Sequence, residues 1–186
     1  MDRGTEYYRR FREEGDESGL AELIREYKDG LILYLYGVVG DLSAAEELAE
    51  DCFVLLGTRK PKDKGKASFK TWLYAIGRNL AIDHLRKRKR KRDVPLEDAP
   101  ELADGEAELE RAYLREERKI AVHRAMRLLK PDYRQALWLL YFEDMSHKEV
   151  AAVMKKSVHA TETLAYRARA ALKNELEKEG IVDENL

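Results

Sequence analysis

One stretch constrains the fold more than any other. Residues 68–92 read SFKTWLYAIGRNLAIDHLRKRKRKR, which begins with aromatic side chains and ends in seven consecutive cations. At about 100° per residue, the apolar side chains of this stretch fall on one narrow arc, as in a helix that packs on a core. These are Phe69, Leu73, Ile76 and Leu80. A second stripe beside that arc consists of Trp72, Asn79, Asp83, Arg86 and Arg90. We therefore predict one long helix with a buried side and a polar side.

The polar side has the residue types of a nucleic-acid-binding surface. Cations neutralise phosphates, an Asn side chain can pair with a base edge, and an aromatic ring can stack on an unpaired base. Trp72 would also fit in a protein core, and a basic run is often only a solvated helix end, so these alternatives stay open. Seven cations without an intervening acid repel one another, which favours contact with nucleic acid.

The composition allows one large domain or two small helical ones. The chain has 186 residues, four prolines and 38% charged residues, which together favour helices. Cys52 is the only cysteine, so no internal disulfide can form. There is no secretory leader and no apolar run long enough to span a membrane, so we expect a cytoplasmic protein without membrane contact.

The net charge of -1 hides a strong segregation of charge along the chain. Residues 1–92 carry 20 cations and 16 anions, residues 93–118 carry 3 and 10, and residues 119–186 carry 12 and 10. Two basic segments therefore flank an acidic one. This pattern suits a protein that contacts DNA at two places and takes additional affinity from a protein partner.

Hydrophobic periodicity predicts three helices before the long one. The first covers residues 5–14, the second is capped by Ser18, and the third begins with a capping box from Ser43 to Glu46. The third helix gathers four acids on its outer side, at spacings of one turn: Glu46, Glu47, Glu50 and Asp51. No nearby lysine offsets their repulsion of a few tenths of a kcal/mol per pair. A basic protein partner and a merely solvated face would each account for this pattern.

Two further segments have the composition of connecting segments. Residues 57–67, GTRKPKDKGKA, contain two glycines, a proline and five cations, and we predict a flexible basic loop. Cations followed by aromatic rings could hold an extruded base. Residues 93–110 contain two prolines, eight acids and no cation. Such a segment cannot bury enough apolar surface to fold, so we predict a linker.

The second half of the chain has the pattern of a helix-turn-helix domain. Helical periodicity is interrupted at Pro131, and a capping box from Ser146 to Glu149 opens a short helix. A turn at residues 155–157 leads into a longer helix that begins at Val158. In a helix-turn-helix the second helix enters the major groove, although a helical hairpin without DNA is an alternative. Away from its core side this helix offers His159, Thr161, Glu162, Tyr166, Arg167 and Arg169.

The expected fold class is therefore all-α. Two small helical domains, residues 1–92 and 111–186, are joined by an acidic flexible linker at residues 93–110. The second of them is the helix-turn-helix domain.

Two stretches carry a resemblance to a known family. The first is AAEELAEDCF at residues 44–53 followed by the long helix at 68–92, and the second is LLKPDYRQALWLLYFEDMSHKEVAAVMKKSVHATETLAYRARAAL at 128–172. They resemble, respectively, the promoter-melting domain (region 2) and the second DNA-binding domain (region 4) of bacterial RNA polymerase sigma factors of the extracytoplasmic-function (ECF) group.

The resemblance implies a sigma factor that binds core RNA polymerase, directs it to promoters and helps to melt the DNA. Docking on the β′ clamp helices is implied for Glu46, Glu47, Glu50 and Asp51, and the β flap is a second implied contact. Contact with the minus-ten DNA and its melting are implied for Lys62, Lys64, Lys66, Phe69, Trp72, Arg78, Asn79, Arg86 and Arg90. Recognition of the minus-thirty-five element is implied for His159, Thr161, Glu162, Tyr166, Arg167 and Arg169. The linker would extend toward the RNA exit path.

The sequence departs from the family at the helix expected to recognise the minus-thirty-five element. The family usually has a small residue, a Thr, a Lys and an Arg where this chain has His159, Ala160, Glu162 and Leu164. Two customary cations are therefore absent. This departure is consistent with an atypical promoter element or with greater reliance on the polymerase.

Three other classes of protein remain as alternatives. A free-standing helix-turn-helix repressor or activator would need a dimerisation helix, and no heptad seam is present. An enzyme is disfavoured because the four histidines share no metal spacing and no Gly-rich phosphate loop occurs. An adaptor that binds polymerase without DNA stays open because of Glu162 and Leu164. We expect no catalytic residue, cofactor or metal and a monomer when free, and we leave open an anti-sigma factor as a partner.

Overall fold

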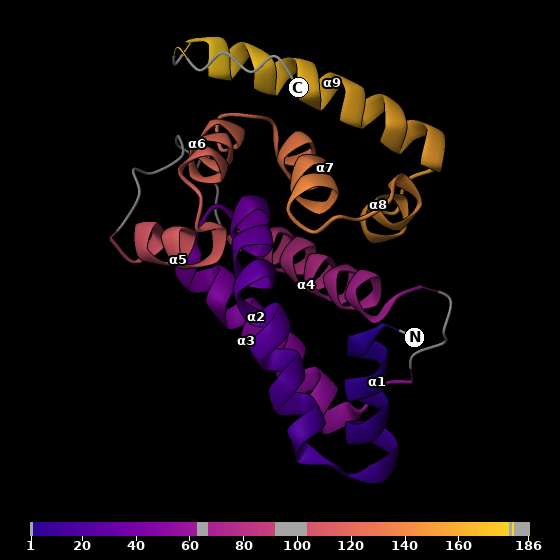
Figure 1. Ribbon diagram of the computed structural model, residues 1–186. Coiled ribbons are helices and arrows are strands. Elements are labelled where there is room, and N and C mark those ends of the chain that lie inside the picture. The colour runs from indigo at the N-terminus through magenta and orange to yellow at the C-terminus, as the bar shows by residue number, and fades with distance from the viewer. Residues whose placement is uncertain (1, 63–66, 92–103, 179, 181–186) are drawn as a thin grey trace. The chain divides into compact units, whose positions relative to one another are not determined.

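The computed structural model describes residues 2–62, 67–91, 104–178 and 180, and every regular element within them is a helix (Figure 1). The chain divides into two compact units, Met1–Arg88 and Lys89–Leu186. The helices of the first unit are α1 (Arg3–Arg9), a π-helical turn (Arg10–Glu14), α2 (Glu17–Val39), α3 (Leu42–Arg59) and α4 (Phe69–Lys91). Those of the second are α5 (Asp104–Leu114), α6 (Glu117–Met126), α7 (Pro131–Tyr141), α8 (His147–Met154) and α9 (Val158–Lys178). The predicted all-α fold with two helical domains is confirmed.

The first unit is built on α2, which packs side by side with α3 and also contacts α1 (Figure 1). Helix α4 comes close to both α2 and α3 at Gly77. A β-carbon at this position would lie 3.0 Å from Leu31 Cδ1, 3.4 Å from Leu35 Cδ2 and 3.5 Å from Cys52 Sγ. The close approach of the α4 backbone therefore depends on the missing side chain.

Helices α2 and α3 begin at aspartates rather than at the predicted serines. The Asp16 side chain accepts a hydrogen bond from the Ser18 backbone N–H at 3.0 Å, and the Asp41 side chain accepts one from Ala44 N–H at 3.0 Å. The predicted Ser18 cap and Ser43 capping box are wrong, because an acid earlier in the sequence already caps each helix. The capping box that Ser146 and Glu149 form at the start of α8 is confirmed.

The second unit is centred on α9, which packs against α6, α7 and α8. Helices α8 and α9 are separated by a three-residue turn in which Lys155 has a φ of 55° (Figure 1). The Ser157 side chain then accepts a hydrogen bond from Ala160 N–H at 3.1 Å and caps α9. The predicted helix-turn-helix is therefore present.

The end of the predicted linker is folded. Helix α5 begins at Asp104, inside the segment predicted as a linker (93–110), while residues 93–103 lie outside the described residues. Within α5, Glu110 is only 1% exposed, and its carboxylate lies 2.7 Å from His123 Nδ1 and accepts a hydrogen bond from Arg124 Nε at 3.1 Å. The linker prediction for residues 104–110 is wrong because it rested on composition alone. Composition does not reveal that His123 and Arg124 of α6 bind the carboxylate of Glu110.

Aromatic packing fixes the same helix to α7. The Tyr113 ring stacks on Trp138 with centroids 5.9 Å apart, and Phe142 stacks on Trp138 at 4.6 Å. The Tyr113 hydroxyl and Trp138 Nε1 both donate to Glu143 Oε1, each at 3.1 Å. Polar and apolar contacts together therefore hold α5 against α7 within the second unit.

The pKa of the buried Glu110 carboxyl reflects these contacts. Burial alone raises the pKa of a carboxyl, but the bonds to His123 and Arg124 outweigh it, and the pKa of Glu110 is lowered from its usual value. A lowered folded-state pKa means that ionised Glu110 stabilises the fold above the unfolded-state pKa. That contribution is lost as the pH falls through the folded-state pKa.

We predict that Gly77→Val lowers the free energy of unfolding by about 1–3 kcal/mol, because the added methyl groups overpack the contact with Leu31 and Cys52. Urea unfolding followed by circular dichroism measures this. Gly37→Ala is the matched control, since a β-carbon there meets no atom within 4 Å in the described structure. It should leave stability unchanged or raise it by up to about 1 kcal/mol. Equal losses in the two variants would contradict the close approach of α4.

We predict that Glu110→Gln destabilises the chain by about 1–3 kcal/mol at pH 7, because it removes a buried charge that His123 and Arg124 face. The difference from wild type should begin to shrink as the pH falls below the ordinary glutamate pKa of 4.5, because the unfolded chain then binds protons, and it should be lost as the pH falls through the lowered pKa of folded Glu110. Thermal unfolding at pH 7 and pH 4, with hydrogen exchange of the α5 amides, measures both effects. Glu108→Gln, an exposed acid on the same helix, should change neither quantity.

Candidate interfaces with protein and nucleic acid

The outer side of α3 is acidic, and its inner side is apolar. We call the exposed side chains of Glu46, Glu47, Glu50 and Asp51 the acidic face. No ion pair joins any of them to another residue in the described part of the chain. The opposite side is buried, and burial raises the pKa of its Cys52 thiol to about 12. The structure thus brings the four predicted acids together on one accessible surface.

Sequence reasoning missed an apolar residue on this surface. Val54 is 51% exposed and follows Glu50 and Asp51 by four and three residues, so it lies on the same side of α3. An exposed apolar side chain among acids could have been found by the same one-turn spacing that identified the acids. It gives the acidic face a contact that does not depend on charge.

At the start of α4, the structure brings Phe69 and Trp72 together but exposes only one of them. Phe69 has no exposed surface and packs against Tyr8, Tyr27 and Trp72, with ring centroids 5.5, 5.6 and 5.8 Å away. Trp72 is half-buried and also lies 5.3 Å from Tyr8. Phe69 therefore supports Trp72 from the core side and cannot itself contact DNA in this conformation.

Asp2 fixes the position of these rings, and the sequence offered no signal for it. Its carboxylate accepts hydrogen bonds from Thr5 N–H and from Phe69 N–H, both at 2.9 Å, and so caps α1 while holding the first residue of α4. Burial raises the pKa of Asp2, but these backbone bonds outweigh it and the pKa is lowered. A contact across 67 positions of sequence joins the two helix starts.

The basic loop is described only at its ends. The Tyr8 hydroxyl donates to the Pro61 carbonyl oxygen, which ties the start of the loop to α1. Lys62 is exposed, whereas Lys64 and Lys66 lie outside the described residues. Tyr8 thus contacts both the loop and Trp72.

Cations and an amide continue along α4 from this start. Arg78 and Asn79 are half-buried, and Arg86 and Arg90 are exposed. Arg86 forms an ion pair with Asp83 at 3.4 Å. Residues 78–90 extend over about 18 Å of helix, along which Asn79, Arg86 and Arg90 lie in one stripe, while Arg78 points about 100° away from Asn79.

In α9, burial separates the predicted DNA contacts into two groups. Thr161 has no exposed surface, and its hydroxyl donates to the Ser157 carbonyl at 3.0 Å, so it belongs to the core. Of the other predicted contacts, His159, Glu162, Tyr166 and Arg167 are exposed. Arg169 is half-buried and donates to the Tyr141 hydroxyl at 3.2 Å.

Thr163 was missed by the sequence analysis. It lies one turn beyond His159, to whose carbonyl its hydroxyl donates at 3.1 Å, and it is partly exposed. A helical wheel centred on the buried residues of α9 places it on the outermost side. The surface that α9 offers is thus formed by residues 159–167 without the buried Thr161 and Ala165.

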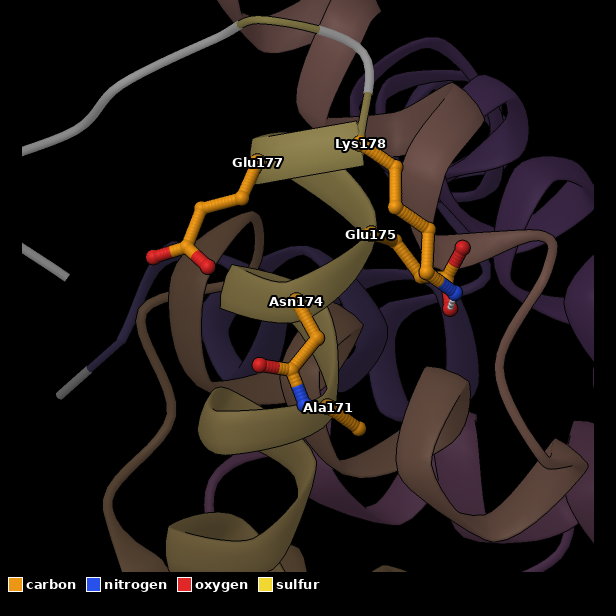
Figure 2. Close-up of a pocket in the computed structure, with 5 residues that line it drawn as sticks. All are labelled: Ala171, Asn174, Glu175, Glu177 and Lys178. Atoms are coloured by element: carbon orange, nitrogen blue, oxygen red, sulfur yellow. Dashed lines mark hydrogen bonds and ion pairs between the residues drawn. The ribbon is translucent and has the colours of Figure 1, made fainter.

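A shallow pocket of about 550 Å³ lies at the other end of α9 (Figure 2). It is lined by Ala171, Asn174, Glu175, Glu177 and Lys178, and a Lys178–Glu175 ion pair of 2.7 Å closes one side. None of the predicted site residues lines it. Among the described residues, no three His, Cys, Asp or Glu side chains are grouped so that they could hold a metal ion.

The geometry defines a class of protein: two helical units, of which the second carries a helix-turn-helix whose second helix has an exposed N-terminal part. Comparison with known families agrees. The model for sigma-70 region 2 matches residues 23–91, and the model for sigma-70 region 4 matches residues 119–172. Helix α5 lies between the two matches. No described helix has the length and apolar character needed to cross a membrane.

Curated relatives cover nearly the same length. RNA polymerase sigma-H factor of Pseudomonas aeruginosa is 33% identical over 172 residues, which cover 88% of this chain and 89% of that protein. ECF RNA polymerase sigma factor SigW of Bacillus subtilis is 28% identical, with 87% and 91% covered. The Escherichia coli ECF RNA polymerase sigma-E factor is 27% identical, with 89% and 90% covered.

Two solved structures share the fold. CnrH, in complex with the cytosolic domain of CnrY, has a TM-score of 0.67 at 21% identity and covers 95% of this chain and 99% of that one. RpoE of Bartonella quintana, in complex with the anti-sigma factor NepR, has a TM-score of 0.66 at 22% identity, with 84% and 96% covered. The chain belongs to the sigma-70 family and to its ECF group. It is a sigma factor that directs RNA polymerase to promoters for the initiation of transcription.

Proposed function

We propose that this sigma factor binds its partners through three separate surfaces. The acidic face of α3 binds the β′ clamp helices, the start of α4 opens the minus-ten DNA, and α9 recognises the minus-thirty-five element as duplex. The observation that carries this proposal is that each surface is exposed on a helix whose other side is buried. The chain acts in the cytoplasm and has no catalytic role of its own.

The case for docking through α3 rests on charge and on Val54. Acids one turn apart repel one another by a few tenths of a kcal/mol per pair, and a basic partner would turn that repulsion into attraction. Val54 is 51% exposed and lies one turn beyond Glu50 and Asp51, at the end of the acidic face. An exposed apolar side chain beside these charges suits a protein interface, in which the buried core is more apolar than the rim.

The case for melting rests on Trp72. Trp72 is partly exposed, and the rings of Phe69 and Tyr8 pack against it on the core side. An unpaired base could therefore stack on an indole ring whose position is already fixed. Lys62 and the cations of α4 lie before and after it in the chain and would neutralise the phosphates of the separated strand. A supported ring loses little conformational entropy when a base stacks on it.

Duplex recognition through α9 depends on the polymerase for much of its affinity. The whole chain has a net charge of -1, and phosphate contacts supply most of the non-specific affinity for DNA. The exposed residues of α9 then select sequence once the holoenzyme has formed. We also propose that this domain contacts the β flap.

An anti-sigma factor is a further proposed partner. The solved neighbours CnrH and RpoE were both captured with a second protein, which for RpoE is the anti-sigma factor NepR. A chain with the same fold presents comparable helix surfaces to such a protein.

We predict that Glu47→Lys combined with Glu50→Lys lowers the affinity for core polymerase at least about tenfold, because reversed charges on α3 would repel a basic partner. Co-elution with core enzyme and a fluorescence titration measure this. The matched control is Glu26→Lys with Asp29→Lys, which makes the same change of charge at exposed positions of α2. Undiminished binding of the α3 variant, or equal loss in both, would remove the docking role of the acidic face.

We predict that Trp72→Ala reduces open-complex formation about five- to hundredfold, as expected from the loss of about 1–3 kcal/mol of stacking on one base. Permanganate reactivity of unpaired thymines, divided by occupancy from footprinting, measures melting apart from binding. Replacing Lys62, Lys64 and Lys66 together by Ala should act in the same direction, and trimming the exposed Lys62 costs no packing.

The contrasting variant for this experiment is Tyr166→Ala on α9. Tyr166 is 70% exposed, so its removal should weaken promoter occupancy but leave reactivity per bound complex unchanged. Wild-type reactivity per complex in both the Trp72 and the lysine variants would contradict the melting role of the start of α4.

A further inference from the structure

Helix α9 carries an exposed carboxylate where the family usually has a cation. Glu162 is exposed, and no ion pair or hydrogen bond of its side chain to another described residue is present. It is the fifth residue of α9, within the part of a recognition helix that contacts base edges. Its neighbours Thr161 and Ala165 are both fully buried, so the core fixes the direction of the edge on which Glu162 lies.

A carboxylate at this place needs a hydrogen-bond donor. Phosphates surround a recognition helix, and an unpaired anion near them weakens binding to every sequence. Within the major groove, guanine offers only acceptors, and thymine offers an acceptor and a methyl group. Adenine places its N6 donor beside the N7 acceptor, which repels a second acceptor. Cytosine offers its N4 amino group with no acceptor on the same base, and this is the group with which Glu and Asp pair.

Three cations lie further along α9, about 7 to 17 Å from Glu162 by helical rise. Arg167 and Lys173 are exposed, and Arg169 is held by its hydrogen bond to Tyr141 at 3.2 Å. These side chains are placed to bind phosphates along the groove, while the shorter Glu162, nearer the start of the helix, meets the bases. The helix thus combines phosphate binding with one acceptor directed at a base pair.

We propose that Glu162 is a specificity-determining residue that accepts a hydrogen bond from the N4 amino group of a cytosine in the upstream promoter element. The inference rests on the proposed function, because it requires α9 to lie in the major groove. Beyond that function, the inference names the base that α9 selects. The loss of the customary cation is then a change of preferred sequence rather than a loss of contact.

The experiment is selection of promoters by holoenzyme, reconstituted from the full chain and core polymerase, from a library with a randomised upstream element. Wild type should enrich cytosine at one position about 5- to 150-fold over the other bases. Because Gln pairs with adenine and Lys with guanine, Glu162→Gln should change the preference at that position to adenine, and Glu162→Lys should change it to guanine. Glu162→Ala should abolish preference there and leave the remaining positions as in wild type.

Glu177→Gln is the matched control. Glu177 is an exposed acid in the last turn of α9, about 22 Å along the helix from Glu162 (Figure 2). This variant should retain the cytosine preference. Co-elution of each variant with core polymerase shows that it is folded and forms holoenzyme.

Two results would overturn the inference in distinguishable ways. If Glu162→Gln and Glu162→Lys bind all sequences more tightly but select the same base as wild type, Glu162 acts only through its charge, and α9 still recognises the promoter. If wild-type holoenzyme selects no upstream base pair at all, the proposed duplex recognition by α9 fails as well.

Discussion

The burial of Phe69 is the contact on which the first unit and its proposed DNA surface both depend. Its ring lies among those of Tyr8, Tyr27 and Trp72 and is completely covered. Burying a side chain of this size contributes about 1.5–3 kcal/mol, and the Asp2 carboxylate holds the Phe69 backbone at the same point. The start of α4 is therefore a rigid part of the core. Trp72 is held in place as well, because its ring packs directly on that of Phe69.

A comparison of free energies explains how helices with like charges on their outer sides remain folded in this protein. Like-charge pairs on α3 cost a few tenths of a kcal/mol each. The inner side of the same helix buries Leu48, Phe53 and Leu56, and each large apolar side chain contributes about 1.5–3 kcal/mol. The free energy gained by apolar packing thus exceeds the cost of charge repulsion several-fold. The helix therefore stays folded even though its outer side carries like charges that a partner could bind. The same reasoning applies to α9, whose core side is held by Leu172 and Leu176.

The fold followed from hydrophobic periodicity, but individual functional side chains did not. Spacing alone located the long helix, the helix-turn-helix and the cap at Ser146. It could not separate Thr161 from Glu162, because both are polar and only the packing of α9 against its neighbours turns one of them inward. The two aspartate caps were missed for a related reason, since several polar residues near a helix start can serve as the cap and tertiary structure selects among them.

Helix α5 shows where composition fails as a guide to order. Its sequence is rich in acids, yet one of them, Glu110, is buried between His123 and Arg124. The Glu110–Arg124 ion pair, in which Arg124 is 43% exposed, adds little net stability compared with apolar packing, because removing the carboxylate from water costs about as much as the attraction returns. The ion pair instead sets the position of α5 along α6. If α5 slipped by one turn against α6, the carboxylate would leave its partners and a buried charge would stand unpaired, at a cost of about 3–5 kcal/mol. The stacking of Tyr113 on Trp138 and the bonds to Glu110 hold α5 in the same orientation. Within the second unit, α5 is therefore held at one position against α6 and α7.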